Sequence, residues 1–170
     1  MLPSEVLSEA FSRVRAVVHS AIEDASIDAL TYRADPEANT IAWLVWHLTR
    51  VQDDHLATLA GGEQVWTTGG WAERFDLPFD SRATGYGHSA DAVAGVHVEA
   101  ELLGLYYDAV HARTMDYLST LGDADFGRVV DLSWNPPVTL AVRLVSILAD
   151  DLQHAGQASY VRGLAARAGL

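Results

Sequence analysis

The chain has 170 residues, of which 49% are hydrophobic and 20% are charged, and these values are typical of one folded globular domain. Its formal net charge is −12, so it would repel a phosphate backbone or an anionic membrane surface, and neither nucleic acid nor a membrane is expected as a partner. It contains no cysteine, which excludes disulfides, thiolate metal sites and a cysteine nucleophile.

Targeting signals are not expected either. The first twenty residues carry acids early and lack the unbroken apolar core of a signal peptide. The sequence contains no run of about 18 apolar residues, so we do not expect a transmembrane helix. These features, together with the absence of cysteine, lead us to expect a cytoplasmic protein.

Four segments show the three- and four-residue spacing of apolar side chains that is typical of amphipathic helices. They cover about residues 4–25, 40–60, 99–121 and 138–167. Ser4 is the expected N-cap of the first segment, with Pro3 outside the helix.

A long connection, about 61–98, separates the second and third predicted helices. Connections of this length are usually functional or separately packed. Two stretches within it, 70–76 and 89–95, could form short helices, and 128–132 is a weak strand candidate. The sequence therefore predicts one all-α domain over residues 1–170, with four antiparallel helices and one long crossover loop.

The pattern most suggestive of chemistry lies in the last helix. Asp150 and His154 are four residues apart, so their side chains project from one face about one turn apart and could share a divalent metal ion. An acid and a histidine at this spacing also form ordinary surface ion pairs. His47 lies in the apolar run 41–48, where a buried imidazole needs a polar partner. It could be a third ligand or a core histidine bonded to a carbonyl or a carboxylate, and Gln157 could bond His154.

Two more residues share these helical faces. Asp54 follows His47 by seven residues and could be a fourth ligand, an orienting partner for His47 or a general base for metal-bound water, although a solvated acid is an equal alternative. Arg143 precedes Asp150 by seven and could hold an anionic substrate group, although surface arginines are commoner. His55 is expected to point away from His47.

Aromatic residues of the long connection could cover such a site. A site in the core of a bundle needs a wall and a rim that selects the substrate. We expect Trp71 or Phe75, together with Arg74, to lie over the mouth of the site, and Trp71 and Arg74 to contact the bound cofactor. Exposed aromatic side chains would also suit a homodimer interface.

Two motifs resemble those of a known family. Residues 39–48 (NTIAWLVWHL) are similar to the second-helix motif of the DinB/YfiT-like superfamily, and residues 150–157 (DDLQHAGQ) to its last-helix motif. The resemblance extends over essentially the whole chain and is closest to proteins from bacteria that use mycothiol. It implies a four-helix bundle in which His47, Asp150 and His154 bind a divalent metal, with Zn²⁺ or Ni²⁺ expected first. Asp150 stands where many relatives have histidine and mycothiol-dependent maleylpyruvate isomerases have glutamate.

The resemblance implies a metal-dependent transferase or isomerase that uses mycothiol as cosubstrate to detoxify or rearrange a small electrophile. Two alternatives remain. One is a metal-dependent hydrolase with Asp54 as the base, which would turn over without added thiol. The other is a non-catalytic binding or stress-response protein, for which neither metal retention nor turnover is expected.

Overall fold

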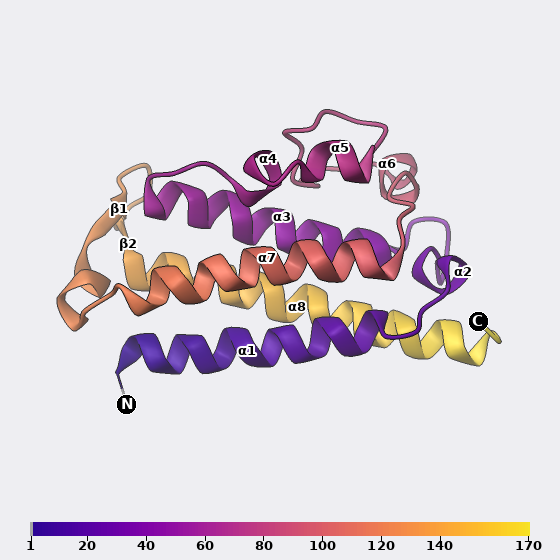
Figure 1. The fold of residues 1–170 in the computed structure, drawn as a ribbon, viewed down its shortest axis with the longest axis horizontal. Coiled ribbons are helices and arrows are strands. Elements are labelled where there is room, and N and C mark those ends of the chain that lie inside the picture. The colour runs from indigo at the N-terminus through magenta and orange to yellow at the C-terminus, as the bar shows by residue number, and fades with distance from the viewer. Residues whose placement is uncertain (1) are drawn as a thin grey trace.

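The computed structural model describes residues 2–170, and this part of the chain forms a bundle of four long helices (Figure 1). They are α1 (Pro3–Ile22), α3 (Ile41–Ala60), α7 (Ala100–Ser119) and α8 (Leu140–Arg167). α3 packs on α8 and α7, and α1 packs on the same two helices from the other side. The predicted all-α four-helix bundle is confirmed. In the described part of the chain, no helix has both the length and the apolar character needed to cross a bilayer.

The direction of α7 differs from the predicted arrangement. α1 and α8 run one way along the bundle, whereas α3 and α7 both run the other way (Figure 1). The long connection after α3 carries the chain back along the bundle, so α7 starts at the same end as α3. A short turn forces neighbouring helices to be antiparallel, but a connection of this length leaves either direction open.

Short elements fill the connections between the long helices. The expected helices at 70–76 and 89–95 are α5 and α6, and the strand candidate at 128–132 is β1, which pairs antiparallel with β2 just before α8. α2 and α4 were not predicted, because a helix of four residues is too short to show periodicity. The short elements are α2 (Ile27–Leu30), α4 (Val65–Thr68), α5 (Trp71–Phe75), α6 (Ala90–Ala94), the 3₁₀ helix η1 (Asp123–Gly127), β1 (Val129–Asp131) and β2 (Val138–Thr139).

The ends of the long helices follow from local chemistry. The side chain of Thr40 accepts a hydrogen bond from the Trp43 backbone nitrogen at 3.0 Å and so caps the start of α3. Gly61 ends α3 in the left-handed conformation, with φ of 66°. α1 begins at Pro3, so Ser4 is not its N-cap. Proline suits the first helical position because its missing N–H would have no partner there.

Asp53, in the middle of α3, anchors the long connection. Its carboxylate is fully buried and accepts hydrogen bonds from the backbone nitrogens of Val65 and Trp66 at 2.8 and 2.7 Å. It also accepts one from the hydroxyl of Tyr106 on α7, at 2.9 Å. The carboxylate thus caps the first turn of α4 and links that turn to two helices of the bundle.

Arg50, one turn earlier on α3, is the buried counter-charge. Its guanidinium lies 3.8 Å from the Asp53 carboxylate and donates to the Gln64 side chain at 2.8 Å. Its Nε donates to the carbonyl of Ala83 at 3.2 Å, and the guanidinium carbon lies 4.8 Å from the ring centre of Trp66. Arg50 and Asp53 therefore bind both ends of the segment 64–83 to α3.

This network leads to a prediction for stability. Asp53→Asn should lower the free energy of unfolding by about 3–5 kcal/mol, because it leaves the buried Arg50 guanidinium without a counter-charge. The measurement is urea denaturation followed by circular dichroism. Asp80→Asn is the matched control, since Asp80 forms an exposed pair with Arg82 and its loss should change little. Equal midpoints for the two variants would show that the Arg50–Asp53 pair does not stabilise the fold.

Candidate metal centre

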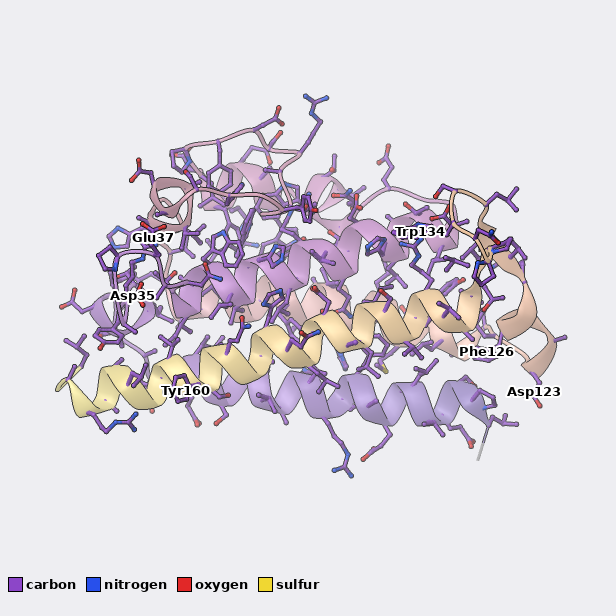
Figure 2. All side chains as sticks on the ribbon, turned by 180° about the vertical axis from the view of Figure 1, so that it is seen from behind. Asp35, Glu37, Asp123, Phe126, Trp134 and Tyr160 are labelled. Atoms are coloured by element: carbon purple, nitrogen blue, oxygen red, sulfur yellow. The ribbon has the colours of Figure 1, made fainter. Side chains whose placement is uncertain are left out.

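Three side chains converge where α3 packs on α8. His47 on α3 and Asp150 and His154 on α8 each offer one ligand atom, and these atoms all lie within 4.8 Å of one another. We call these three residues the triad. Among residues 2–170, no other group of histidine and acidic side chains has this geometry. Figure 2 shows the face of the bundle on which α3 and α8 lie side by side.

His47 is held from the long connection. Its Nδ1 lies 2.5 Å from the carbonyl oxygen of Thr84. A carbonyl only accepts hydrogen bonds, so Nδ1 carries the proton and Nε2 keeps its lone pair for a ligand. Gly85 permits this approach: its φ is +99°, and a Cβ there would lie 2.5 Å from the His47 Nδ1. Trp43 stacks on the imidazole, with ring centres 4.6 Å apart.

His154 is oriented in the same manner. Its Nδ1 lies 3.0 Å from the side-chain oxygen of Gln157, as the sequence spacing predicted, and its Nε2 lies 3.5 Å from the Asp150 carboxylate. The other carboxylate oxygen of Asp150 is buried and has no hydrogen-bond partner among the described residues. Leaving a buried acceptor without a partner costs about 1–3 kcal/mol, and more when it is charged. A cation between the three side chains would provide that partner.

The surroundings set the charges of the triad. Burial lowers the pKa of His47 and keeps its imidazole neutral. The carboxylate of Asp150 raises the pKa of His154. Burial on its own would raise the pKa of Asp150, but the imidazoles of His154 and His47 outweigh it and lower this pKa. The triad therefore offers one anionic oxygen and two imidazole nitrogens.

Asp151 does not belong to the triad, although it follows Asp150 directly. Its side chain is fully buried, and neither carboxyl oxygen has a hydrogen-bond partner within residues 2–170. Burial, with a smaller contribution from the charge of Asp150, raises the pKa of Asp151 well above its usual value. One residue along a helix turns the side chain by about 100°, which directs Asp151 into the core.

Asp54 and Arg143 are held by partners outside the triad, and both lie toward the end of the bundle where α3 ends and α8 begins. Asp54 accepts a hydrogen bond from Gln64 at 2.6 Å and lines a separate cavity of about 500 Å³. Arg143 is paired with Asp131 at 2.6 Å and lies 3.5 Å from Nδ1 of His55. His55, which was expected to point away, turns toward α8 and lies within electrostatic reach of Asp150.

Trp71 and Arg74 lie in the packed part of the long connection. The Trp71 ring is 8% exposed and lies against Tyr106 of α7, with ring centres 5.4 Å apart. Arg74 stacks over Trp71, its guanidinium carbon 4.0 Å from the ring centre, and Phe75 also packs against Tyr106. These contacts are with α7, whereas the triad lies between α3 and α8. The structure therefore places these aromatic rings in the packing between the long connection and α7, and not over the mouth of the site.

The segment that does reach the triad is 84–88. Besides Thr84 and Gly85, it supplies His88, whose Nδ1 accepts a hydrogen bond from the Trp43 indole at 3.2 Å. His88 also stacks on Trp46, with ring centres 5.7 Å apart. The role of Thr84 could not be predicted from the sequence, because it acts through its backbone carbonyl, which every residue has. The two glycines of the Gly85-Tyr86-Gly87 run were the available signal of unusual backbone.

Comparisons with known proteins agree with the fold and the motifs. The family model of mycothiol-S-transferases matches residues 6–166, a range that includes the triad. A solved structure described as the crystal structure of the conserved protein of locus from Enterococcus faecalis is similar, with a TM-score of 0.89 and 30% sequence identity. The likeness covers 95% of this chain and 96% of that chain. No curated protein matches the chain. On the family match, the chain belongs to the mycothiol-S-transferases, a DinB-like family.

Proposed function

We propose that this protein is a divalent-metal-dependent transferase that joins mycothiol to a small electrophile. The observation that carries the proposal is the triad: three ligand atoms within 4.8 Å of one another, in a chain that belongs to the mycothiol-S-transferase family. The chain has no cysteine, so the sulfur nucleophile must come from a cosubstrate.

The triad fits a divalent ion such as Zn²⁺ or Ni²⁺. His47, Asp150 and His154 would hold the ion through two imidazole nitrogens and one carboxylate oxygen, a donor set that these borderline metals accept. The unpartnered buried oxygen of Asp150 supports the fit. When bound, such an ion supplies Lewis acidity, which lowers the pKa of a thiol that coordinates it and makes the sulfur a better nucleophile at neutral pH.

The protein's own residues set the geometry of the transfer. Thr84 and Gln157 fix the tautomers and orientations of the two imidazoles. In the reaction the thiol gives its proton to solvent and its sulfur forms a bond to the electrophilic carbon. The bond from that carbon to the leaving group breaks, and the leaving group departs with the electron pair.

Arg143 is suited to the thiol side of the site. With Asp131 and His55 it lines a small cavity of about 160 Å³ between α3 and the start of α8. Arg143 precedes Asp150 by seven residues on α8, so this cavity lies about 10 Å along the helix from the triad. We propose that polar groups of the thiol contact Arg143, whose guanidinium is fixed by Asp131. Asp54 lines a different cavity, and no role in the reaction is proposed for it.

Substitution of single triad residues should show whether these side chains bind metal or only stabilise the fold. His47→Ala and His154→Ala should each weaken Zn²⁺ or Ni²⁺ binding by more than about 100-fold, because loss of an outer partner alone costs about 10–100-fold. Asp150→His should retain binding, and Asp150→Asn should weaken it without unfolding the protein. Calorimetry gives the affinities. A metal concentration 100 times the Kd should stabilise the wild type by about 2.7 kcal/mol.

The same proteins test the function. With metal, mycothiol and an alkyl bromide, the wild type should form the thioether, detected by mass spectrometry, and His154→Ala should not. Consumption of the bromide without added thiol would instead indicate hydrolysis. A wild type that neither retains metal nor turns over would indicate a binding protein.

Gly85 should be needed for metal affinity although it offers no ligand. Gly85→Ala places a Cβ against the His47 ring, so the Thr84 hydrogen bond cannot form, and metal affinity should fall about 10–100-fold. Gly87→Ala is the matched control, because Gly87 also has a positive φ of 73° but its Cβ would meet no described atom within 4 Å. Both variants carry backbone strain, so only the clash separates them. Equal metal affinities, measured by calorimetry, would contradict this role.

Metal affinity should depend on pH through His154. Because its pKa is raised, His154 is still largely protonated at pH 6.5, the ordinary histidine pKa. A metal ion that binds at this pH must displace that proton. The Kd should be constant at high pH and rise about tenfold per pH unit once the pH falls below the pKa of His154. His47, whose pKa is lowered, should add a second proton only at lower pH. Competition titrations from pH 5 to 8 would measure this, and a Kd that is flat down to pH 6 would refute it.

A further inference from the structure

An uncharged groove lies beside the triad, on the side away from Arg143. We infer that this groove binds the electrophile and that its occupant is a neutral, apolar acceptor. The inference rests on the proposed function and adds the position and the chemical class of the second substrate.

The groove has a volume of about 530 Å³, within the usual range for small-molecule sites. Its floor and walls come from the start of α3, the outer side of α8 and the segment between α2 and α3. None of the described residues that line it is charged. The residues that matter most for the argument are Ala38, Leu44, Gly156, Gln157, Tyr160 and Leu164.

The groove is continuous with the triad. Gln157 lines it, and the same side chain holds the His154 ring at 3.0 Å. Leu44 lines it from α3, one turn before His47. Along α8 the lining extends from Gln153 to Leu164, about 16 Å at 1.5 Å per residue. A ligand in the groove can therefore place one end at the triad.

Charge selects the occupant. The chain has a formal net charge of −12. The segment that walls the groove carries Asp35 and Glu37, labelled with Tyr160 in Figure 2, against one arginine, Arg33, whose Nε donates to the Ala38 carbonyl. An anionic acceptor would be repelled. A neutral apolar one would gain about 25 cal/mol for each Å² of apolar surface that it removes from water.

The two substrates would then approach the triad from opposite ends of α8. Arg143 and Asp131 give the N-terminal side its polar character, and the C-terminal side is the uncharged groove. A polar thiol and an apolar acceptor are sorted by this difference. Their reacting atoms, the sulfur and the electrophilic carbon, meet between the two cavities at the triad.

Gly156→Leu tests the groove. A Cβ at Gly156 would meet no described atom within 4 Å, so a leucine can extend into the groove without a backbone clash. Leucine also has a higher helix propensity than glycine, so α8 should remain folded. Gly163→Leu is the matched control: it lies on the same helix seven residues later, and its Cβ would be in ordinary contact, 3.5 Å from the Arg167 side chain.

Two readouts are needed. The first is thiol-free binding of the neutral fluorescent probe N-phenyl-1-naphthylamine to the metal-loaded protein. The second is kcat/KM with mycothiol for methyl, butyl and hexyl bromide. Gly156→Leu should weaken probe binding at least tenfold and lower kcat/KM for hexyl bromide at least tenfold relative to methyl bromide. Metal affinity and the KM for mycothiol should not change, and Gly163→Leu should resemble the wild type.

Several outcomes would overturn the inference. Probe binding that Gly156→Leu leaves intact would do so, as would an equal loss of kcat/KM for all three bromides. A wild-type dimer that Gly156→Leu dissociates, with probe binding unchanged, would show that a second copy of the chain covers this face. If the wild type binds the probe in the groove but turns over no bromide, the groove stands as an apolar ligand site while the transferase function fails.

Discussion

The buried pair of Arg50 and Asp53 is the interaction on which the arrangement of the site depends. Burying two charges is costly, and the cost is offset here by hydrogen bonds from Arg50 and Asp53 to the long connection. One of these bonds runs from Arg50 to the carbonyl of Ala83, and the next carbonyl along the chain, that of Thr84, orients His47. The charges in α3 thus fix the course of the segment that directs the His47 ring toward α8.

The three candidate ligands share a rigid base. Asp150 and His154 are one turn apart on a helix of 28 residues, and His47 lies on the helix that packs directly against it. Small rotations of α3 or α8 would separate the ligand atoms, and both helices are fixed by the bundle core. The groove and the polar cavity lie along the same α3–α8 contact, so one packing interface positions the ligands and both neighbouring cavities.

The fold and the triad were accessible from the sequence because each rests on a repeated pattern. Apolar spacing predicted the four long helices, and the four-residue spacing with the DinB-like motifs indicated His47, Asp150 and His154. The direction of α7 was not accessible, since a long connection imposes no direction. The directions of Asp54 and His55 could not be predicted either, because neighbouring residues on a helix point about 100° apart and a small error in the helix orientation exchanges their environments. Thr84 acts through its backbone, which any residue possesses, so its identity gave no warning of its role.

The burial of Asp151 has a consequence for the charge balance of the neighbouring site. Two adjacent aspartates could supply two negative charges, but the second is enclosed in the core, where burial raises its pKa well above the usual value and so favours its neutral form. A divalent ion held by Asp150 and two neutral imidazoles would keep one unit of positive charge. A second ionised carboxylate at that distance would cancel most of it. By directing one acid away from the triad, the helix would leave a bound divalent ion electron-poor enough to favour the anionic sulfur of the proposed reaction.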